Sequence, residues 1–483
     1  MTTAMGARRL ARIIGTGPFA PPAYESLAGA IAHAVSDGRI PVGVRLPSER
    51  ELATALDLSR TTSSRAYARL RELGFVRTRR GSGSLVELPE VPGGRIDHLL
   101  SPTEPTAGSI DLTCTATVAP LGLVDAYERA VSQVHAYLPG TGYYPSGIPA
   151  LRELVAARYT QRGLPTRPDD ILITSGALGG AAIGIRALLG GSGGVLVESP
   201  SYPNAIATIE GAGARIVAYP LEVDDDGRHR WDVRAMGQTM RENRVRAAYL
   251  IPDFHNPTGA LLPDADRAAL AAELGRSGVV PVVDESLVEL GLDGTPGQTP
   301  LSVFAPDSIA VGSTSKIFWG GLRVGWMRVP AGRMEEAAVV RLTLDLGAPV
   351  LEQLVAVELL RNHDELVAQM RARLAAARDR LVADVRTHLP SWQVAVPGGG
   401  MALWARLPEE RSGALVSAAR AHGVTLASGP NFAPIGGLDR WIRLPYTVAE
   451  AELAEVAPRL AAAWEDALRM PGPIPDERAR IVA

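Results

Sequence analysis

From about Asp111 onward, short runs rich in Val and Ile alternate with stretches rich in Ala and Leu that have helical spacing. Short, strongly apolar runs are typical of strands buried on both faces, and their regular alternation with helices is typical of a parallel sheet between helical layers. We therefore predict an α/β domain with a mainly parallel sheet. Its predicted strands cover residues 171–174, 194–198, 214–218, 247–251, 279–284 and 308–313.

Charge separates this acidic domain from a small basic one. Residues 1–88 hold 13 arginines and seven acidic residues, a net charge of +6, whereas the whole chain carries −3. Residues 89–109 are rich in Pro, Gly and Ser with little periodicity, as is typical of a linker. We predict an N-terminal domain over residues 20–88, a linker over residues 89–109 and the large domain over residues 110–470.

The N-terminal domain has the pattern of three helices and a hairpin. Apolar residues at four-residue spacing predict a helix that includes residues 27–35, and Ser48 with Glu51 predicts a capping box that opens a second helix. Ser59 is predicted to cap a third helix, after which two short strands flank the cationic glycine turn at 79–83. The third helix has a predicted inward face of Thr62, Ala66, Leu70 and Leu73, and an outward face of Arg60, Thr61, Ser64 and Arg65.

A cationic helix that follows another helix and a short turn is the arrangement that enters the major groove of DNA, and a basic hairpin beside it can contact phosphate or the minor groove. The alternative is a small helical domain with an ordinary charged surface. Residues 46–86 closely resemble the winged helix-turn-helix of GntR-type repressors along their whole length. The resemblance implies that double-stranded operator DNA is a partner and is contacted by Arg50, Arg60, Thr61, Gly81 and Gly83.

Some residues of this domain fall outside that resemblance. Arg65 is our addition to the predicted DNA-binding surface because it shares the helical face of Arg60, and solvated surface charge is the alternative. Ser63 stands where the family usually has an apolar residue such as valine, so we expect the third helix to be held less firmly against its core. We expect a disordered, solvated tail rather than a DNA-contacting arm at the N-terminal arginines Arg8, Arg9 and Arg12.

In the large domain, one residue type narrows the possible chemistry. Arginine supplies 48 of the 49 basic residues, and the single lysine is Lys316. Of these two cations only lysine can lose its proton and attack a carbonyl carbon, because the arginine guanidinium stays charged. Chance placement is the alternative, and the neighbouring motifs decide between the two.

Polar motifs follow the predicted strands, and the carboxyl ends of parallel strands are where such sheets bind ligands. Gly176 opens a helix whose N–H groups can hold a phosphate, and Asp284 ends an apolar strand where an unpaired carboxylate would be costly. Each motif alone has a structural alternative, such as packing, a turn or a salt bridge. Together, a phosphate cradle, a carboxylate able to keep a pyridine nitrogen protonated and a reactive lysine indicate a pyridoxal phosphate site.

Across residues 143–443 these motifs resemble, in the same order, those of fold-type-I aminotransferases. The resemblance implies that Lys316 is the catalytic residue and binds the cofactor covalently, that Asp284 pairs with the pyridine nitrogen and that Asn256 hydrogen-bonds the ring oxygen. It also implies that Tyr202 stacks on the ring. It assigns a substrate or effector α-carboxylate to Arg443, and the cofactor phosphate to Gly176, Ala177, Ser313 and Arg323.

Two features leave questions open within that resemblance. Aminotransferases usually have a tyrosine two or three positions after the aspartate, and here those positions are Ser286 and Leu287. We therefore do not expect enzymatic turnover as the main function, although partial transaminase activity stays open. The segment at 141–159 matches the family region that reaches into the partner subunit, and either Tyr143 or Tyr144 can take that role.

A GntR-type domain joined by a linker to an aminotransferase-like domain resembles the MocR/GabR family of transcriptional regulators. The resemblance implies a head-to-tail homodimer in which an amino acid, an amine or pyridoxal phosphate acts as effector through Lys316 and changes how the DNA-binding domains are spaced. One alternative is a catalytically active aminotransferase with an accessory DNA-binding domain. Another is a regulator whose cofactor site is vestigial.

The remaining composition excludes other classes of protein. Cys114 is the only cysteine, which excludes a disulfide framework, a zinc finger and an iron–sulfur cluster and favours a cytoplasmic location. We predict no metal site. The longest weakly polar run, residues 171–185, is too short and too rich in glycine to span a bilayer, so we expect no membrane role.

Overall fold

The computed structural model describes residues 4–36, 39–79, 83–87, 89, 108–120, 122–190, 193–294 and 298–470. Contacts divide the chain into two compact units. One unit, the head, comprises Met1–Asp97, Val118–Leu121 and Ala449–Ala451. The other unit, the body, comprises His98–Thr117, Gly122–Val448 and Glu452–Ala483.

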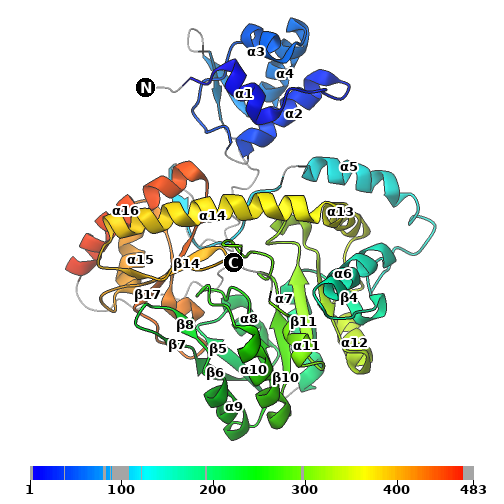
Figure 1. Cartoon of the computed structure of the whole chain (residues 1–483), viewed down its shortest axis with the longest axis vertical. Coiled ribbons are helices and arrows are strands. Elements are labelled where there is room, and N and C mark those ends of the chain that lie inside the picture. The colour runs from blue at the N-terminus through cyan, green and yellow to red at the C-terminus, as the bar shows by residue number, and fades with distance from the viewer. Residues whose placement is uncertain are drawn as a thin grey trace. The chain divides into compact units, whose positions relative to one another are not determined.

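The head packs its helices around an apolar core, and a short hairpin follows them (Figure 1). Its elements are α1 (Ala7–Ile14), α2 (Ala23–Ser36), α3 (Glu49–Leu56), α4 (Arg60–Glu72), β1 (Val76–Arg79) and β2 (Gly83–Val86), and the two strands pair antiparallel. The predicted capping box of α3 is confirmed, because the Glu51 N–H donates to Ser48 Oγ and the Ser48 N–H donates to Glu51 Oε2. Ser59 caps α4 by accepting a hydrogen bond from the Thr62 N–H at 3.0 Å.

Helix α1 corrects the prediction of a solvated N-terminal tail. Its Leu10 is fully buried and its Ala11 is nearly so, and both belong to the core of the head. Arg39 donates a hydrogen bond to the Ile13 carbonyl at 2.6 Å, which satisfies one of the exposed carbonyls at the end of the helix. The prediction was wrong because the helix has only two turns, and three arginines obscure its apolar spacing.

The inward face of α4 also differs from the prediction. Its buried residues are Ser63, Ala66, Tyr67 and Leu70, whereas Leu73 is 37% exposed and Thr62 is only partly buried. Tyr67 explains the difference, because its ring is fully buried and its hydroxyl donates to the Pro47 carbonyl at 2.6 Å. Burying this large side chain turns the helix by about one residue relative to the predicted face.

The body is built on a seven-stranded sheet with the order β4-β12-β11-β10-β9-β5-β6. Its strands are β4 (Ile171–Thr174), β5 (Gly194–Ser199), β6 (Arg215–Pro220), β9 (Val245–Leu250), β10 (Val280–Asp284), β11 (Ile309–Ser313) and β12 (Gly325–Arg328). The six predicted strands are confirmed, and neighbouring strands are parallel except at β12, which is antiparallel to both of its neighbours. β12 was not predicted, because its sequence GWMR lacks a run of Val and Ile.

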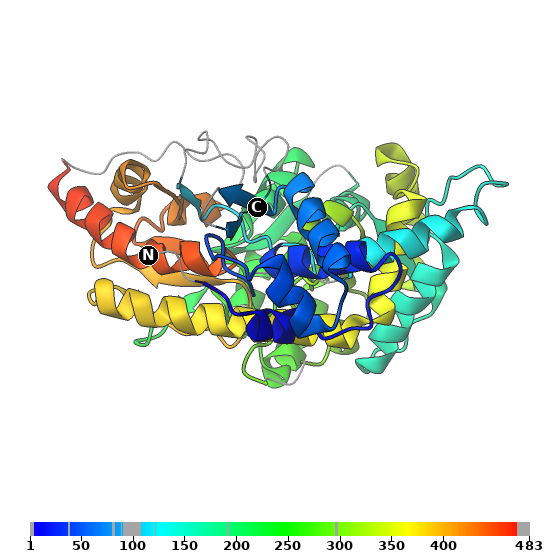
Figure 2. The same cartoon turned by 90° about the horizontal axis from the view of Figure 1, so that it is seen from above.

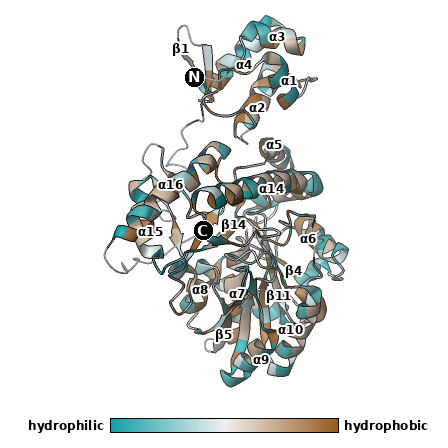
Figure 3. Ribbon diagram, turned by 60° about the vertical axis from the view of Figure 1, so that its left-hand side comes forward, coloured by the Kyte–Doolittle hydropathy of each residue, from teal (hydrophilic) through white to brown (hydrophobic). Residues whose placement is uncertain are grey.

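Helices cover both faces of this sheet, as the predicted α/β class requires (Figure 1). One face packs against α7 (Ala177–Leu189), α8 (Pro203–Gly211) and α12 (Met334–Leu344). The other face packs against α9 (Val233–Glu242), α10 (Asp264–Ser277) and α11 (Leu301–Phe304). Figure 3 shows hydrophilic and hydrophobic residues side by side on helices such as α9 and α10, which is the pattern of helices with one buried side.

A smaller antiparallel sheet has the order β13-β14-β17-β16, and its strands are β13 (Gln393–Val394), β14 (Ala402–Arg406), β16 (Ala427–Ser428) and β17 (Trp441–Pro445). Two long helices, α14 (His363–His388) and α16 (Glu450–Arg469), lie side by side in both Figure 1 and Figure 2. The other main elements are α5 (Leu123–Val134), α6 (Pro149–Gln161), α13 (Val350–Arg361), α15 (Ser412–Ala421), and the paired strands β3 (Ile110–Asp111) with β15 (Val424–Thr425) and β7 (Glu222–Val223) with β8 (His229–Arg230). None of the helices in the described ranges combines the length and apolar character needed to cross a bilayer.

Candidate functional site

The predicted site residues of the body lie at one edge of the large sheet. The register pairs Ser313, at the end of β11, with Gly325, at the start of β12, and it pairs Gly325 with Thr174, at the end of β4. Asp284 ends β10, the strand on the other side of β11. The strand order therefore brings together motifs that are far apart in the sequence.

Lys316 lies in the turn after β11. Its amine donates a hydrogen bond to the Thr115 carbonyl at 3.1 Å. Burial lowers the pKa of the Lys316 amine below its usual value. A lower pKa increases the fraction of neutral amine, which is the form that attacks a carbonyl carbon, so the single lysine has the environment of a nucleophile.

Asp284 is 8% exposed and is held at both carboxylate oxygens. The Tyr249 hydroxyl donates to its Oδ2 at 2.6 Å, and the Ser286 N–H donates to its Oδ1 at 2.9 Å. Both donors are neutral. An unpaired carboxylate at this buried position would be costly, and neither of these two donors supplies a positive charge to pair with it.

The turn between β4 and α7 has the geometry of an anion cradle. Gly176 has a φ of 86°, which favours glycine, and Ala177 is the first residue of α7. Arg323 donates from Nη2 to the Ser175 carbonyl at 3.1 Å, and a Cβ atom added to Gly176 would lie 3.0 Å from the same nitrogen. Because a helix N-terminus, a guanidinium and the nearby Ser313 all offer donors at this edge of the sheet, the arrangement suits a phosphate.

Arg443 lies on β17 and is fully buried. It donates from Nη1 to Asn256 Oδ1 at 3.3 Å and from Nη2 to the Thr113 carbonyl at 2.5 Å, and its guanidinium carbon lies 4.9 Å from the centre of the Phe432 ring. Burial lowers the pKa of Arg443 to about 10, so the guanidinium stays charged at neutral pH. The small sheet therefore presents a buried cation next to Asn256, as a carboxylate site requires.

Tyr202 precedes α8 and packs against the core cluster under the large sheet. Its hydroxyl accepts a hydrogen bond from Asn204 Nδ2 at 2.9 Å, and burial raises the pKa of Tyr202 above its usual value. Asn256 follows β9 and is partly buried. The two tyrosines left open by the sequence analysis differ, because Tyr143 is 65% exposed whereas Tyr144 packs its ring edge against Tyr137.

Three contact residues were missed in the sequence analysis. Thr113 and Thr115 offer their carbonyls to Arg443 and Lys316, and Tyr249 donates to Asp284. The threonines occur in a stretch without helical or strand periodicity. Tyr249 lies inside a predicted strand, where an aromatic residue indicates only core packing. No local pattern distinguishes these residues.

The predicted DNA-binding residues of the head are solvent-exposed where the structure describes them. Arg50 lies on α3, and Arg60, Thr61 and Arg65 lie on α4, all four on the surface. The guanidinium carbon of Arg65 lies 3.9 Å from the centre of the Tyr24 ring, so this arginine already has a contact within the head. Gly83 begins β2 with a φ of 77°, and Gly81 lies outside the described residues.

Comparison with known families agrees with this geometry. Residues 23–86 match the model of the gntR family of bacterial regulatory proteins, and residues 124–460 match the model of aminotransferase class I and II, which covers more than half of the chain. The chain belongs to the aminotransferase class I and II family. With its gntR-type head, it has the MocR/GabR-type architecture predicted above and is a DNA-binding regulator with an aminotransferase-like body.

Individual relatives include both regulators and an enzyme. The HTH-type transcriptional regulator TauR of Rhodobacter capsulatus is 26% identical over 470 residues, which cover 90% of this chain and 94% of the relative. The 2-aminoadipate transaminase of Thermus thermophilus is 30% identical over 342 residues, 69% of this chain and 82% of the relative. The crystal structure of LysN, an alpha-aminoadipate aminotransferase from Thermus thermophilus complexed with N-(5'-phosphopyridoxyl)-L-leucine, has a TM-score of 0.66 at 27% identity, over 75% of this chain and 93% of that chain.

Proposed function

We propose that this MocR/GabR-type regulator senses a small amino compound, or pyridoxal phosphate itself, through Lys316, and that the bound effector changes how the head engages operator DNA. Pyridoxal phosphate is the cofactor of the aminotransferase-like body. When bound, it supplies an aldehyde at which the Lys316 amine and an effector amine can exchange. Arg443 is the proposed partner of an effector α-carboxylate.

The residues at the edge of the large sheet fit this cofactor. The turn at Gly176 and Ala177, with Arg323 and Ser313, would hold the phosphate. Arg323 lies so close to this turn that a Cβ atom at position 176 would come within 3.0 Å of its Nη2 atom. A protonated pyridine nitrogen would supply the cation that the buried Asp284 carboxylate does not receive from its two neutral donors. Asn256 and Tyr202 would contact the ring oxygen and the ring face, as the family resemblance implies.

One observation carries the proposal, namely that a single segment contacts both effector-binding groups. Lys316 donates to the Thr115 carbonyl, and Arg443 donates to the Thr113 carbonyl. A carboxylate that takes Arg443 in a bidentate geometry competes with the Thr113 carbonyl, and covalent use of the Lys316 amine removes the donor to Thr115. The effector carboxylate therefore competes with this segment for Arg443, and the lysine-bound cofactor competes with it for Lys316.

This segment begins close to the end of the predicted linker at residues 89–109, which joins the body to the head. Displacing the Thr113 carbonyl from Arg443 would change the anchoring of the chain at the body end of the linker. The effector would thus bind the conformation with a released segment better than the conformation with a held one. Such a difference in affinity between two conformations is what a ligand needs to shift their populations.

A homodimer is part of the proposal, because two heads are needed to contact two half-sites of an operator. The body offers apolar surface that supports it. Large apolar side chains with more than half of their area exposed include Val124, Val131, Leu138, Val339, Leu342 and Ile435. Exposed apolar side chains of this size are typical of protein–protein interfaces when they gather on one face.

An absorbance spectrum of the purified full-length protein, followed by titration with a panel of amino acids and amines, tests the proposal. We expect a visible band from the lysine-bound cofactor that shifts with one class of compound. Lys316→Ala should abolish the band in a folded protein, and Lys316→Arg should do so too, because it keeps the charge but cannot form the bond. An unchanged band in either variant would contradict the assignment of Lys316, and rapid net amino transfer to a keto acid would favour a working aminotransferase.

A further inference from the structure

Asp284 receives a hydrogen bond from a buried tyrosine that lies outside the motifs described above. Tyr249 lies on β9, next to β10, and its hydroxyl lies 2.6 Å from Asp284 Oδ2. We infer that Tyr249 is a positioning residue, which orients the Asp284 carboxylate toward the pyridine nitrogen of the cofactor and thereby tunes the cofactor's affinity and proton equilibrium. This inference rests on the proposed function.

The geometry of the sheet explains why this tyrosine reaches Asp284. Tyr249 pairs in register with Val282, and Asp284 follows two residues later on the same face of β10. The Tyr249 side chain therefore needs only to extend toward the carboxyl end of the neighbouring strand. That end of the sheet is the edge at which Gly176, Ser313 and Lys316 also gather.

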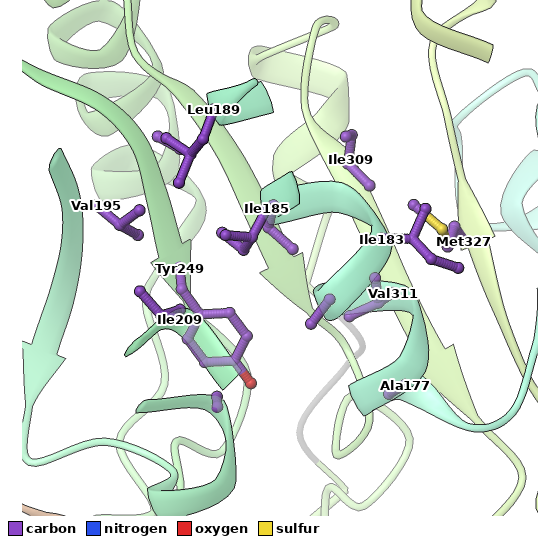
Figure 4. Packing of buried hydrophobic residues seen from close by; sticks show 14 of the residues in the cluster. Ala177, Ile183, Ile185, Leu189, Val195, Ile209, Tyr249, Ile309, Val311 and Met327 are labelled. Atoms are coloured by element: carbon purple, nitrogen blue, oxygen red, sulfur yellow. The ribbon is translucent and has the colours of Figure 1, made fainter. Parts of the chain in front are cut away.

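The ring of Tyr249 is surrounded by apolar side chains and is 1% exposed. Figure 4 shows the ring close to Ile209 within the core cluster, with the hydroxyl oxygen as its only polar atom. A phenylalanine would satisfy the packing of this site equally well. The hydroxyl is therefore not needed for the core, and it donates its hydrogen bond to Asp284.

The direction of the hydrogen bond is settled by electrostatics. Burial and the neighbouring Asp284 charge raise the pKa of Tyr249 well above its usual value, so the hydroxyl keeps its proton and acts as the donor. Asp284 Oδ1 is held by the Ser286 N–H at the same time. With one donor on each oxygen, the carboxylate plane is fixed, and the remaining lone pairs can serve the cofactor.

Loss of the Tyr249 hydroxyl has two expected consequences. The carboxylate would lose one of its two fixing contacts, which should weaken the affinity for pyridoxal phosphate by about tenfold, as expected for one hydrogen bond to a charged group. Without this donor, Asp284 would also be a stronger base and would draw the pyridine proton toward itself. The ring would then withdraw less charge from the lysine nitrogen, so the midpoint of the absorbance change with pH should move upward.

The experiment compares Tyr249→Phe with Tyr219→Phe in the full-length protein. Tyr219 is a matched control, because it is also buried on the large sheet and its hydroxyl donates to the Asp232 carbonyl at 2.8 Å, at a place that holds none of the proposed site residues. The equilibrium affinity for pyridoxal phosphate and the pH titration of its absorbance are measured for both variants and the wild type. We expect both variants to unfold at slightly lower temperature, and only Tyr249→Phe to show weaker cofactor binding and a shifted midpoint.

The possible results separate this inference from the proposed function. If the wild type binds the cofactor and Tyr249→Phe matches the Tyr219→Phe control in affinity and midpoint, Tyr249 has a packing role only and the inference is overturned. If Tyr249→Phe changes stability but neither cofactor measurement, the same conclusion holds. If the wild type takes up no pyridoxal phosphate, the proposed function is overturned together with the inference.

Discussion

The head and the body use the same cation in opposite ways. In the head, Arg50 and Arg60 are exposed on α3 and α4, and the buried sides of these two helices fix where the arginines point. In the body, Arg443 is itself fully buried and is held by Asn256 and by the Thr113 carbonyl. Since arginine supplies nearly every cation of this chain, burial rather than residue type separates the two uses.

The difference teaches what each surface can recognise. An exposed guanidinium contacts a polyanion at a solvated surface, so the contribution of each contact is modest and falls with added salt. A buried guanidinium is costly to place, and it recovers that cost only with oxygen partners in a fixed geometry. The exposed arginines suit a long phosphate backbone with many contacts, and Arg443 suits one small carboxylate.

The largest expected effect is at the buried arginine. Arg443→Gln should weaken the affinity for a carboxylate effector by about 100-fold or more, because it removes a buried, hydrogen-bonded charge partner. The titration of cofactor absorbance with the effector measures this loss. The effector affinity of the wild type should depend little on salt concentration, as expected for an ion contact shielded from the solvent.

Arg378→Gln is the matched control for Arg443→Gln. Arg378 is also nearly buried and holds Asp293 at 2.6 Å, but it lies on α14 and contacts none of the proposed site residues. We expect this variant to lose stability and keep its effector affinity. Equal losses of effector affinity in the two variants would show that Arg443 acts through the fold, and the contrast between the head and the body would fail.

A smaller effect is expected at the exposed arginine of the head. If Arg60 contacts a base, Arg60→Ala should weaken operator binding by about 1–3 kcal/mol. If Arg60 contacts a phosphate, the substitution should reduce the slope of log affinity against log salt concentration by about one. Binding to operator DNA at several salt concentrations separates these outcomes. Arg69→Ala is the control on the same helix, because Arg69 is exposed but pairs with Glu72 at 3.1 Å. Equal effects at positions 60 and 69 would indicate a diffuse charge effect rather than groove contact.

Elements with a strong local period could be predicted from the sequence. The six buried strands and the capped helices α3 and α4 were predicted because each has an apolar run or a cap within a few residues. Helix α1 and strand β12 were missed, because arginine and glycine interrupt their short apolar patterns. The inward face of α4 was misplaced because Tyr67 anchors it through a contact with Pro47, which lies outside the helix.

The same distinction between local patterns and tertiary contacts applies to the residues of the candidate site. Lys316, Asp284 and the glycine turn could be proposed from the sequence because each lies at or after the end of a recognisable strand, and the parallel sheet brings strand ends together. The contacts of Thr113 and Thr115 could not be predicted, since they join residues about 200 and 330 positions apart. Tertiary packing alone creates such contacts, and a single sequence carries no local signal for them.

The smallest expected effect concerns the support beneath the exposed arginines. Ser63 is fully buried on α4, and its hydroxyl finds no hydrogen-bond partner among the residues that the structure describes. Ser63→Val replaces this polar atom with an apolar group, so thermal unfolding should show the head stabilised by about 1 kcal/mol. Operator affinity should stay nearly unchanged, because Ser63 is buried inside the head, whereas Arg60 is exposed to solvent. Ser63→Ala, which adds no volume, is the control. If valine destabilises the head and alanine does not, the space under α4 is too small for valine. If both variants destabilise the head, the hydroxyl has a role in holding the DNA-binding helix.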